Sequence, residues 1–453
     1  MQLPISAFFA LILLLFGCGS PAAPATADSA DAENASASAG DALSSLAGAD
    51  ISADSADGAD VAPNPDAAEP DATDAGAGFV MAPHPALPQV LNMGGKVLEK
   101  PHIRALVYGD DPYAADVQKL LQQIAASTYW PTIAAEYGIG ELTVDPQILI
   151  GPIAPDVVSE KEIVDWLKGG MGTAPGKWGN ADAGTIYLLV VPPQTDFQSG
   201  SDSSSCCVAH GGYHQEVKLG ATLVPFAVAC ACDSPDEGLS AKDALTSTIA
   251  HELIEAATDP FPNINPAFSQ QSSAYAAWTD ISDGEVADLC EFNLDSNINV
   301  LGVDYVVARS WSNKSAAANH EPCLPNPYTG PFFGAVPLLN DSIVLFNFQG
   351  VSIKTKGVKI AVGESATVDV VLYSDGPIDG QWKVSAIDFQ QGIAGQAKPK
   401  LKFTWDHTKG NNGDVLHLTI KVLAADAAFK GELFMIQAQM GERTSDWMGA
   451  VGQ

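Results

Sequence analysis

The segment His251-Glu252-Leu253-Ile254-Glu255 constrains this chain more than any other part of its sequence. It matches the zinc-site pattern H-E-x-x-H, with the second histidine replaced by glutamate. Residues four apart on a helix share one face, so His251 and Glu255 can bind the same cation. Glu252 points about 100° away around the helix axis, where the general base of such a site lies. The segment therefore predicts a helix that carries two metal ligands and one catalytic carboxylate.

The same residues have a plainer interpretation as parts of an ordinary core helix. Short patterns of one histidine and two glutamates arise by chance on many helices. In that case Glu255 hydrogen-bonds to a neighbouring loop, and His251 is a core histidine with satisfied nitrogen atoms. Calcium is a further alternative to zinc, because calcium favours oxygen ligands and would leave His251 out.

A zinc site that activates water needs three protein ligands and one open position, and the helix supplies only two. The candidates for the third, in order of preference, are Glu285 and Asp288, then Asp259, then His214 and His210. The first two lie just before Cys290, whose disulfide would tie them to the fold. Glu252 would act as the general base that takes a proton from the water attacking a carbonyl. Arg309 or Tyr305 is a candidate, by residue type alone, for stabilising the oxyanion.

Residues 1–18 are typical of an export signal. Phe8–Phe16 is almost wholly apolar and too short to span a bilayer. It leads into Leu15-Phe16-Gly17-Cys18, which resembles a bacterial lipobox with Cys18 as the lipidation site, although no Lys or Arg precedes it. An ordinary secretory peptide with a chance cysteine is the alternative. Because Gly19-Ser20 differs from an inner-membrane retention signal, we expect a lipid anchor in the outer membrane or at the cell surface.

Residues 19–87 are rich in Ala, Asp, Ser, Gly and Pro, and we expect a disordered, acidic stalk. The formal net charge of the whole chain is −32. That charge argues against nucleic acid as a partner, because the chain has no basic patch to neutralise phosphates. Acidity continues between residues 259 and 325, where Arg309 and Lys314 are the only Arg or Lys. Such density of carboxylates suits divalent cations or simple solubility.

Apart from Cys18, six cysteines remain, and an even number in an exported chain indicates three disulfides. We expect Cys290 to pair with Cys323, and the loop of Cys206 and Cys207 to be joined to Cys230 and Cys232. The alternative is a zinc site built from the two close pairs. Neither pair has the C-x-x-C spacing, and an oxidising compartment disfavours that site.

Residues 88–330 have the pattern of an α/β domain. Apolar runs predict strands, apolar residues at helical spacing predict helices, and Pro131 predicts a break within the first helix. Ser240 with Asp243 marks the start of the metal-ligand helix, and Pro260 marks its end. Strands followed by a buried helix that presents His and Glu are compatible with a zincin. The expected strands are 103–108, 185–191 and 223–228, and the expected helices are 114–137, 158–167 and 240–259.

Residues 337–453 alternate apolar and polar side chains in short segments separated by turns. This pattern predicts an antiparallel, Ig-like β-sandwich. The segment contains no cysteine and no catalytic cluster, so a structural or adhesive role is expected for it. The expected strands are 351–362, 366–373, 381–387, 400–405, 415–422 and 432–439.

The chain also resembles the secreted EXORDIUM (phosphate-induced) proteins and their bacterial relatives. Their helix motif H-E-L-x-E-x-x-T-[DN]-P stands here at residues 251–260, and their E-[IV]-[GA]-D-L-C stands at residues 285–290. Gly94-Gly95-Lys96-Val97-Leu98 and Gly212-Tyr213-His214 are similar as well. The resemblance covers about Gly94 to Trp311, with a long insertion at Phe261–Trp278. It implies a zincin-like fold and a site shared by His251, Glu252, Glu255, Glu285 and Asp288.

Two functions remain in view. The first is a surface-anchored, zinc-dependent hydrolase, with peptides as substrates. The second is a non-catalytic extracellular binding protein or a structural lipoprotein of the cell envelope, with a structural ion or none. In the second case the sandwich would recognise a cell-surface glycan or protein.

Overall fold

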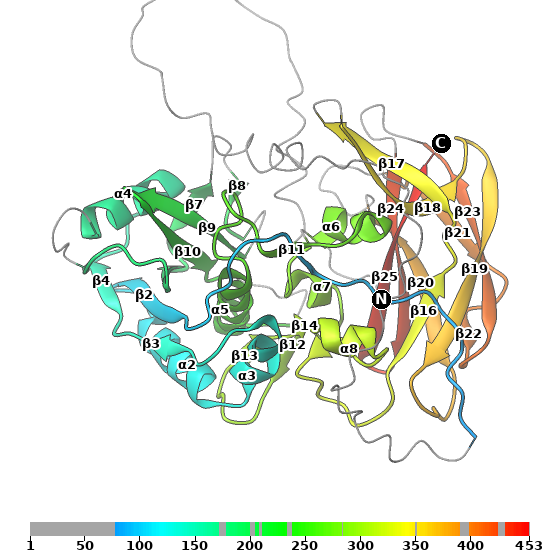
Figure 1. The fold of residues 1–453 in the computed structure, drawn as a ribbon, viewed down its shortest axis with the longest axis horizontal. Helices are drawn as coiled ribbons and strands as arrows, with labels where there is room; N and C mark the ends of the chain where they lie inside the picture. The colour runs from blue at the N-terminus through cyan, green and yellow to red at the C-terminus, as the bar shows by residue number, and fades with distance from the viewer. Residues whose placement is uncertain are drawn as a thin grey trace, which may run out of the picture.

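The computed structural model describes residues 78–171, 178–199, 204–207, 211–232, 238–282, 284–348, 351–389, 398–424 and 431–452. The expected export signal 1–18 with Cys18, residues 19–77 of the expected stalk, and His210 lie outside these residues. The described chain forms two parts, a mixed sheet with helices and a pair of facing β-sheets (Figure 1). Among these residues, no helix combines the length and the apolar character that crossing a bilayer requires.

The first part is built on a mixed sheet that is parallel at its centre. Strand β6 is buried along its whole length, as its continuous apolar sequence predicts. It pairs in parallel with β2 on one side and with β10 on the other, and β9 adds to β10 in the antiparallel direction. The sheet order is β3 (Thr143–Val144), β2 (His102–Tyr108), β6 (Thr185–Val191), β10 (Thr222–Cys230) and β9 (Gly212–Leu219), with β4 (Ile148–Gly151) also beside β2.

Helices around this sheet follow the predicted segments, with one correction. The predicted helix 114–137 is divided into two. Helix α2 covers Ala114–Ala126, and a separate helix α3 (Tyr129–Ala134) continues into η3 (Ala135–Tyr137). The break therefore lies before Pro131, which occupies the first turn of α3, where its missing N–H is tolerated. Helix α4 (Glu160–Gly170) begins at a reciprocal capping box of Ser159 and Glu162.

Three disulfides hold the loops of the first part, and they confirm the expected pairing. Cys206 bonds to Cys230 and Cys207 bonds to Cys232, so the segment after β8 (Ser204–Ser205) is fixed to the end of β10. Cys290–Cys323 joins α7 (Asp288–Glu291) to β15 (Cys323–Leu324). The remaining short elements are β1 (Leu91–Asn92), β5 (Val157–Ser159), β7 (Asp196–Ser199), β11 (Phe268–Gln270), β12 (Asn297–Asn299), β13 (Val306–Ala308), β14 (Ser310–Trp311) and α8 (Asn313–Ala317).

The second part is a β-sandwich, as predicted. One sheet has the order β16 (Phe333–Pro337), β19 (Ser365–Ser374), β23 (Val415–Val422) and β21 (Leu401–Trp405). The other has the order β17 (Asp341–Phe348), β18 (Val351–Lys359), β25 (Arg443–Gly452), β24 (Gly431–Met440), β20 (Trp382–Asp388) and β22 (Lys409–Gly410). Neighbouring strands are antiparallel except β18 and β25, which run in parallel. Alternate residues of β23 are buried between the sheets.

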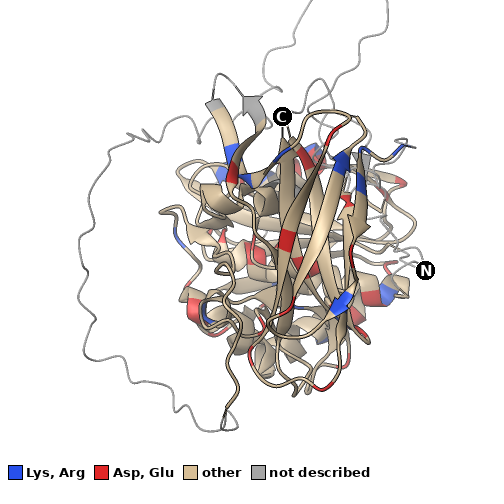
Figure 2. Ribbon diagram, turned by 90° about the vertical axis from the view of Figure 1, so that its right-hand side faces the viewer, with Lys and Arg blue, Asp and Glu red and all other residues tan. Residues whose placement is uncertain are grey.

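Sequence patterning did not predict four of these strands, namely β16, β17, β22 and β25. Strand β16 begins at Phe333, before the expected start of the sandwich at residue 337, and pairs with β19. Strand β25 lacks an alternating pattern because the outer face of its sheet is covered by the first part of the chain. In Figure 2 the ribbon positions of Lys and Arg are interspersed with those of Asp and Glu along the chain.

The two parts share a continuous hydrophobic core. The segment η5 (Ser273–Tyr275) and α6 (Ala276–Ser282) packs on β18 and β25. There the Trp278 ring meets the Trp447 ring edge-on, with 5.7 Å between centroids. The backbone N–H of Leu294 also donates to the Thr444 hydroxyl at 2.8 Å. The long insertion 261–278 thus supplies a large share of the contact with the sandwich.

Residues 78–87, which the sequence places in the stalk, instead pack on the sandwich. Asn412 accepts from the backbone N–H of Ala82 and donates to the carbonyl of Val80, both at 2.9 Å. The His84 ring stacks on Tyr373 at 3.6 Å between centroids. The blue segment of Figure 1 shows this path from the sandwich toward the mixed sheet. Paired backbone groups and buried apolar contacts fix this segment despite its composition.

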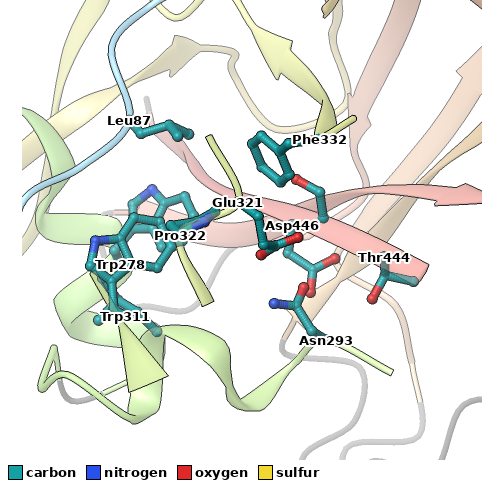
Figure 3. A pocket seen from close by; sticks show the side chains of 11 residues that line it. Leu87, Trp278, Asn293, Trp311, Glu321, Pro322, Phe332, Thr444 and Asp446 are labelled. Carbon is teal, nitrogen blue, oxygen red and sulfur yellow. The ribbon is translucent and has the colours of Figure 1, made fainter. Parts of the chain in front are cut away.

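A small cavity at the junction of the two parts contains one unusual carboxyl group. Trp278 and Trp311 line it from the first part, and Asp446 lines it from β25 (Figure 3). Both oxygens of Asp446 are shielded from solvent, and neither makes a hydrogen bond of good geometry. Burial raises the pKa of Asp446 to about 8, with a further increase from Asp295 and a partial offset from Gln437.

The buried Asp446 should make folding stability depend on pH. A carboxyl whose folded pKa lies above its unfolded value stabilises fully only below the unfolded pKa, and that stability falls as pH rises toward about 8. We expect wild-type stability to fall relative to Asp446→Asn by about 1 kcal/mol per pH unit between about pH 5 and about pH 7. Urea unfolding at several pH values measures this difference. The exposed Asp165→Asn should show no such slope, and equal slopes for wild type and Asp446→Asn would contradict the prediction.

Candidate metal centre

Helix α5 (Ala241–Thr258) carries the predicted metal-ligand pattern through the centre of the first part. Ser240 caps its N-terminus, because its hydroxyl accepts from the backbone N–H of Asp243 at 3.2 Å. The helix packs against β9 and β10 on one side and β13 on another. It is therefore buried nearly all round, and its carboxylates Glu252 and Glu255 are only 5% and 2% exposed. Carboxylates buried to this degree need partners of opposite charge or a metal.

The first group of candidate ligands consists of His251, Glu255 and Asp288. Nε2 of His251 lies 3.1 Å from Oε2 of Glu255 and 3.1 Å from Oδ1 of Asp288. The two helix residues meet because they are one turn apart, and Asp288 reaches them from α7. The side chains of His251 and Asp288 retain 17% and 12% exposure, so solvent reaches this group. The structure thus places Asp288, one of the two acids ranked first, beside His251 and Glu255.

A second group consists of His214, Glu252 and Glu255. Nδ1 of His214 lies 3.5 Å from Oε2 of Glu252 and 3.9 Å from Oε2 of Glu255. Its other nitrogen, Nε2, lies 3.1 Å from the carbonyl oxygen of Asp259. A carbonyl oxygen only accepts, so Nε2–H donates to it, and Nδ1 faces the two glutamates. His214 ranks low among the sequence candidates because the sequence pattern indicates a loop there, whereas the residue lies on strand β9.

Backbone amides orient the carboxylates of the first group. Oε1 of Glu255 accepts from the N–H groups of Ala287 and Asp288 at 3.0 and 3.2 Å. Oδ2 of Asp288 accepts from the N–H of Glu285 at 3.2 Å. These bonds leave Oε2 of Glu255 and Oδ1 of Asp288 directed at His251. The disulfide Cys290–Cys323 fixes the same segment two residues after Asp288. Contacts of this kind, outside the ligands themselves, hold metal ligands in position.

Asp259 and Glu285 lie beside the two groups without belonging to either. Asp259 ends α5, and its Oδ1 accepts from the backbone N–H of Ala267 at 2.8 Å, which secures the turn after the helix. Oε1 of Glu285 lies 3.6 Å from Nε2 of His214, on the side of the ring that faces away from Glu252. Asp288 is therefore the acid that the geometry brings to His251.

Arg309 and Tyr305 do not reach the centre, so their expected role at an oxyanion is wrong. The Arg309 side chain is 0% exposed and pairs with Asp295 at 2.9 Å and Glu321 at 3.1 Å. It also donates to the carbonyl of Cys323. The Tyr305 hydroxyl donates to Asp116 at 2.8 Å. Residue type alone could not reveal these partners, which come from distant segments of the chain.

Burial and mutual attraction shift the protonation of the whole cluster. Burial lowers the pKa of His214 and His251, but the surrounding carboxylates outweigh it and hold both values well above the usual range. Burial raises the pKa of Glu252, and raises that of Glu285 well above its usual value. For Glu255 the nearby imidazoles outweigh burial and lower the pKa. The centre therefore carries an excess of acid that attracts positive charge, either protons or metal ions.

The first group fits zinc better than calcium. Zinc bonds of about 2.0–2.2 Å in a tetrahedral site separate neighbouring ligand atoms by about 3.3–3.6 Å. The 3.1 Å separations around Nε2 of His251 are close to that range. An imidazole nitrogen with two carboxylates is a donor set for zinc and other transition metals, whereas calcium takes oxygen ligands. Three protein ligands also leave one position open, as in catalytic sites.

Gly212 allows β9 to approach the helix at Glu252. A Cβ atom at this position would lie 2.6 Å from the carbonyl of Val228, 2.6 Å from Thr248 Cγ2 and 2.8 Å from Glu252 Oε1. We expect Gly212→Ala to lower stability by about 1–3 kcal/mol, because the backbone and Glu252 must both shift.

The matched control for Gly212→Ala is Gly169→Ala. It adds a methyl group to a position of α4 with nothing within 4 Å, where helix propensity favours alanine by about 1 kcal/mol. Chemical denaturation compares the two variants. Equal stability of Gly212→Ala and wild type would show that the contact is not tight.

Comparison with known proteins assigns no family to the chain. No protein-family model and no curated protein matches it. Solved structures that are similar include the BIgI domain of beta protein from S. agalactiae bound to CEACAM1, with 11% identity and a TM-score of 0.16 over 27% of this chain and 95% of that one. The PapD-like domain 7 of human CEP192 gives 11% and 0.17, covering 29% and 92%, and the titin M3 domain gives 11% and 0.13, covering 21% and 85%. No functional statement follows from these values.

Proposed function

We propose that this chain is an exported, zinc-dependent hydrolase that acts on peptides. The observation that carries the proposal is the convergence of His251 Nε2, Glu255 Oε2 and Asp288 Oδ1 from two helices within reach of one ion. The fold around them is proposed to be zincin-like, and the chain is proposed to be related to the EXORDIUM proteins. Partial solvent access at His251 and Asp288 supports a site that a substrate can approach.

The proposed chemistry assigns a separate task to each residue. A zinc ion, when bound, would polarise the substrate carbonyl and increase the acidity of water. Glu252 takes a proton from the attacking water, because it is a buried carboxylate on the same helix, one residue from His251. Burial raises the pKa of Glu252 toward the pH at which a base works best. His214 orients Glu252 through its Nδ1, 3.5 Å away.

Disulfides and the lipobox-like segment support a location outside the cytoplasm. Three disulfides form in oxidising compartments and persist there. We propose that Cys18 anchors the chain to the outer membrane or cell surface, and that the sandwich binds a cell-surface glycan or protein near the substrate. The alternative is a non-catalytic extracellular binding protein or a structural lipoprotein of the cell envelope, with a structural ion or none at the centre.

A peptide-library digest tests the proposal. The full-length protein, loaded with zinc, should cleave a subset of peptides, and chelation or His251→Ala should abolish cleavage. His417→Ala, which removes an exposed histidine of the sandwich, is the matched control and should cleave normally. Bound zinc without cleavage would overturn the hydrolase. Absence of bound metal would overturn the metal site itself.

A further inference from the structure

We propose that the centre holds two metal ions, bridged by Glu255. His251, Glu255 and Asp288 would bind the first ion, and His214, Glu252 and Glu255 would bind the second. The inference rests on the proposed function, because both groups include Glu255. It goes beyond that function by making His214 a ligand of an additional ion and by giving Glu252 a second role, as a ligand, besides that of the base.

The position of Glu255 is the first argument. Its Oε2 lies 3.1 Å from Nε2 of His251 and 3.9 Å from Nδ1 of His214, so one oxygen atom faces both imidazoles. Its Oε1 is occupied by two backbone amides and cannot serve either side. A single carboxylate oxygen between two imidazole nitrogens is the arrangement expected of a bridging ligand in a two-metal site.

The orientation of His214 is the second argument. Metal-binding histidines usually donate their other N–H to a carbonyl or carboxylate, which fixes the ring and its tautomer. His214 does so through Nε2, 3.1 Å from the carbonyl of Asp259 at the end of α5. Nδ1 is thereby presented to Glu252 and Glu255.

Metal counting tests the inference without any assay of activity. Zinc bound to the full-length protein after dialysis should be two per chain by elemental mass spectrometry. His214→Ala and the isosteric Glu252→Gln should each bind one, and His417→Ala should bind two. The same chain loaded with Mn²⁺ should give the electron paramagnetic resonance spectrum of a magnetically coupled pair, a readout that needs no variant.

The outcomes separate this inference from the proposed function. One zinc per chain in the wild type, unchanged in His214→Ala and lost in His251→Ala, would overturn the second ion and keep the hydrolase site. Uncoupled Mn²⁺ at one ion per chain would have the same meaning. No bound ion at all would overturn both proposals.

Discussion

Glu252→Gln should lower turnover by about 10²–10⁴-fold while the ion held by His251, Glu255 and Asp288 remains bound. The amide has nearly the shape of the carboxylate but cannot accept the proton of the attacking water. Neither His251 nor Asp288 depends on Glu252 for its contacts with the first ligand group. The peptides cleaved most rapidly by wild type in the library digest serve as substrates, and initial rates are compared at saturating zinc.

Two controls separate this result from a loss of folding. Circular dichroism and the unfolding midpoint should show that Glu252→Gln folds, because the substitution preserves volume. Ser240→Ala, which weakens the cap of the same helix and costs about 1 kcal/mol, should keep normal turnover. Unchanged turnover in Glu252→Gln would remove Glu252 from the mechanism, whatever the metal content.

Arg309→Met should destabilise the protein by about 3–5 kcal/mol. The guanidinium is fully buried, and it pairs with Asp295 and Glu321 while donating to the carbonyl of Cys323. Methionine fills similar space but leaves two buried carboxylates without a counter-charge, and this uncompensated charge is the main cost. Urea unfolding measures the loss as a lower midpoint.

The comparison for Arg309 is an ion pair at the surface. Lys161 and Asp165 lie one turn apart on α4 at 2.6 Å, with 82% and 51% of their side chains exposed. Lys161→Met should therefore change stability by less than about 1 kcal/mol. If Arg309→Met were as mild as Lys161→Met, the buried pairs would contribute far less than their geometry indicates.

Local signals in the sequence predicted the parts of the fold that depend on nearby residues. The cap at Ser240 and the proline at 260 set the limits of α5, which runs from Ala241 to Thr258. The uninterrupted apolar run of residues 185–191 became the buried strand β6. The close cysteine pairs also found the expected partners. In each case the deciding interaction lies within a few residues or follows from a restricted set of cysteines.

Features that depend on distant segments were missed. Strand β25 is buried on both faces by α6 and the opposite sheet, so it shows no alternation for a pattern to detect. Arg309 looked like a site residue because the sequence cannot show that Asp295 and Glu321 surround it. His214 was ranked low because only the pairing of β9 with β10 brings it over Glu252 and Glu255.

The same distinction applies to the candidate centre. The spacing of His251 and Glu255 on a helix was sufficient to bring them together at 3.1 Å. The choice between Asp288 and Glu285, which rank equally from the sequence, needed the structure, because Asp288 lies against His251 and Glu285 lies against His214. Sequence spacing therefore defines a helix face, whereas the third ligand is set by how the chain returns to that face.

Zinc titration of the full-length protein and its Asp288→Asn variant tests the central claim most directly. After chelation and dialysis, wild type should bind zinc, and Asp288→Asn should bind it more than about 100-fold more weakly, since loss of even an outer-shell contact costs about 10–100-fold. His320→Ala, which removes an exposed histidine paired with Asp375, should bind like wild type. Equal affinity of wild type and Asp288→Asn, or no zinc bound by wild type, would contradict a metal centre at His251, Glu255 and Asp288.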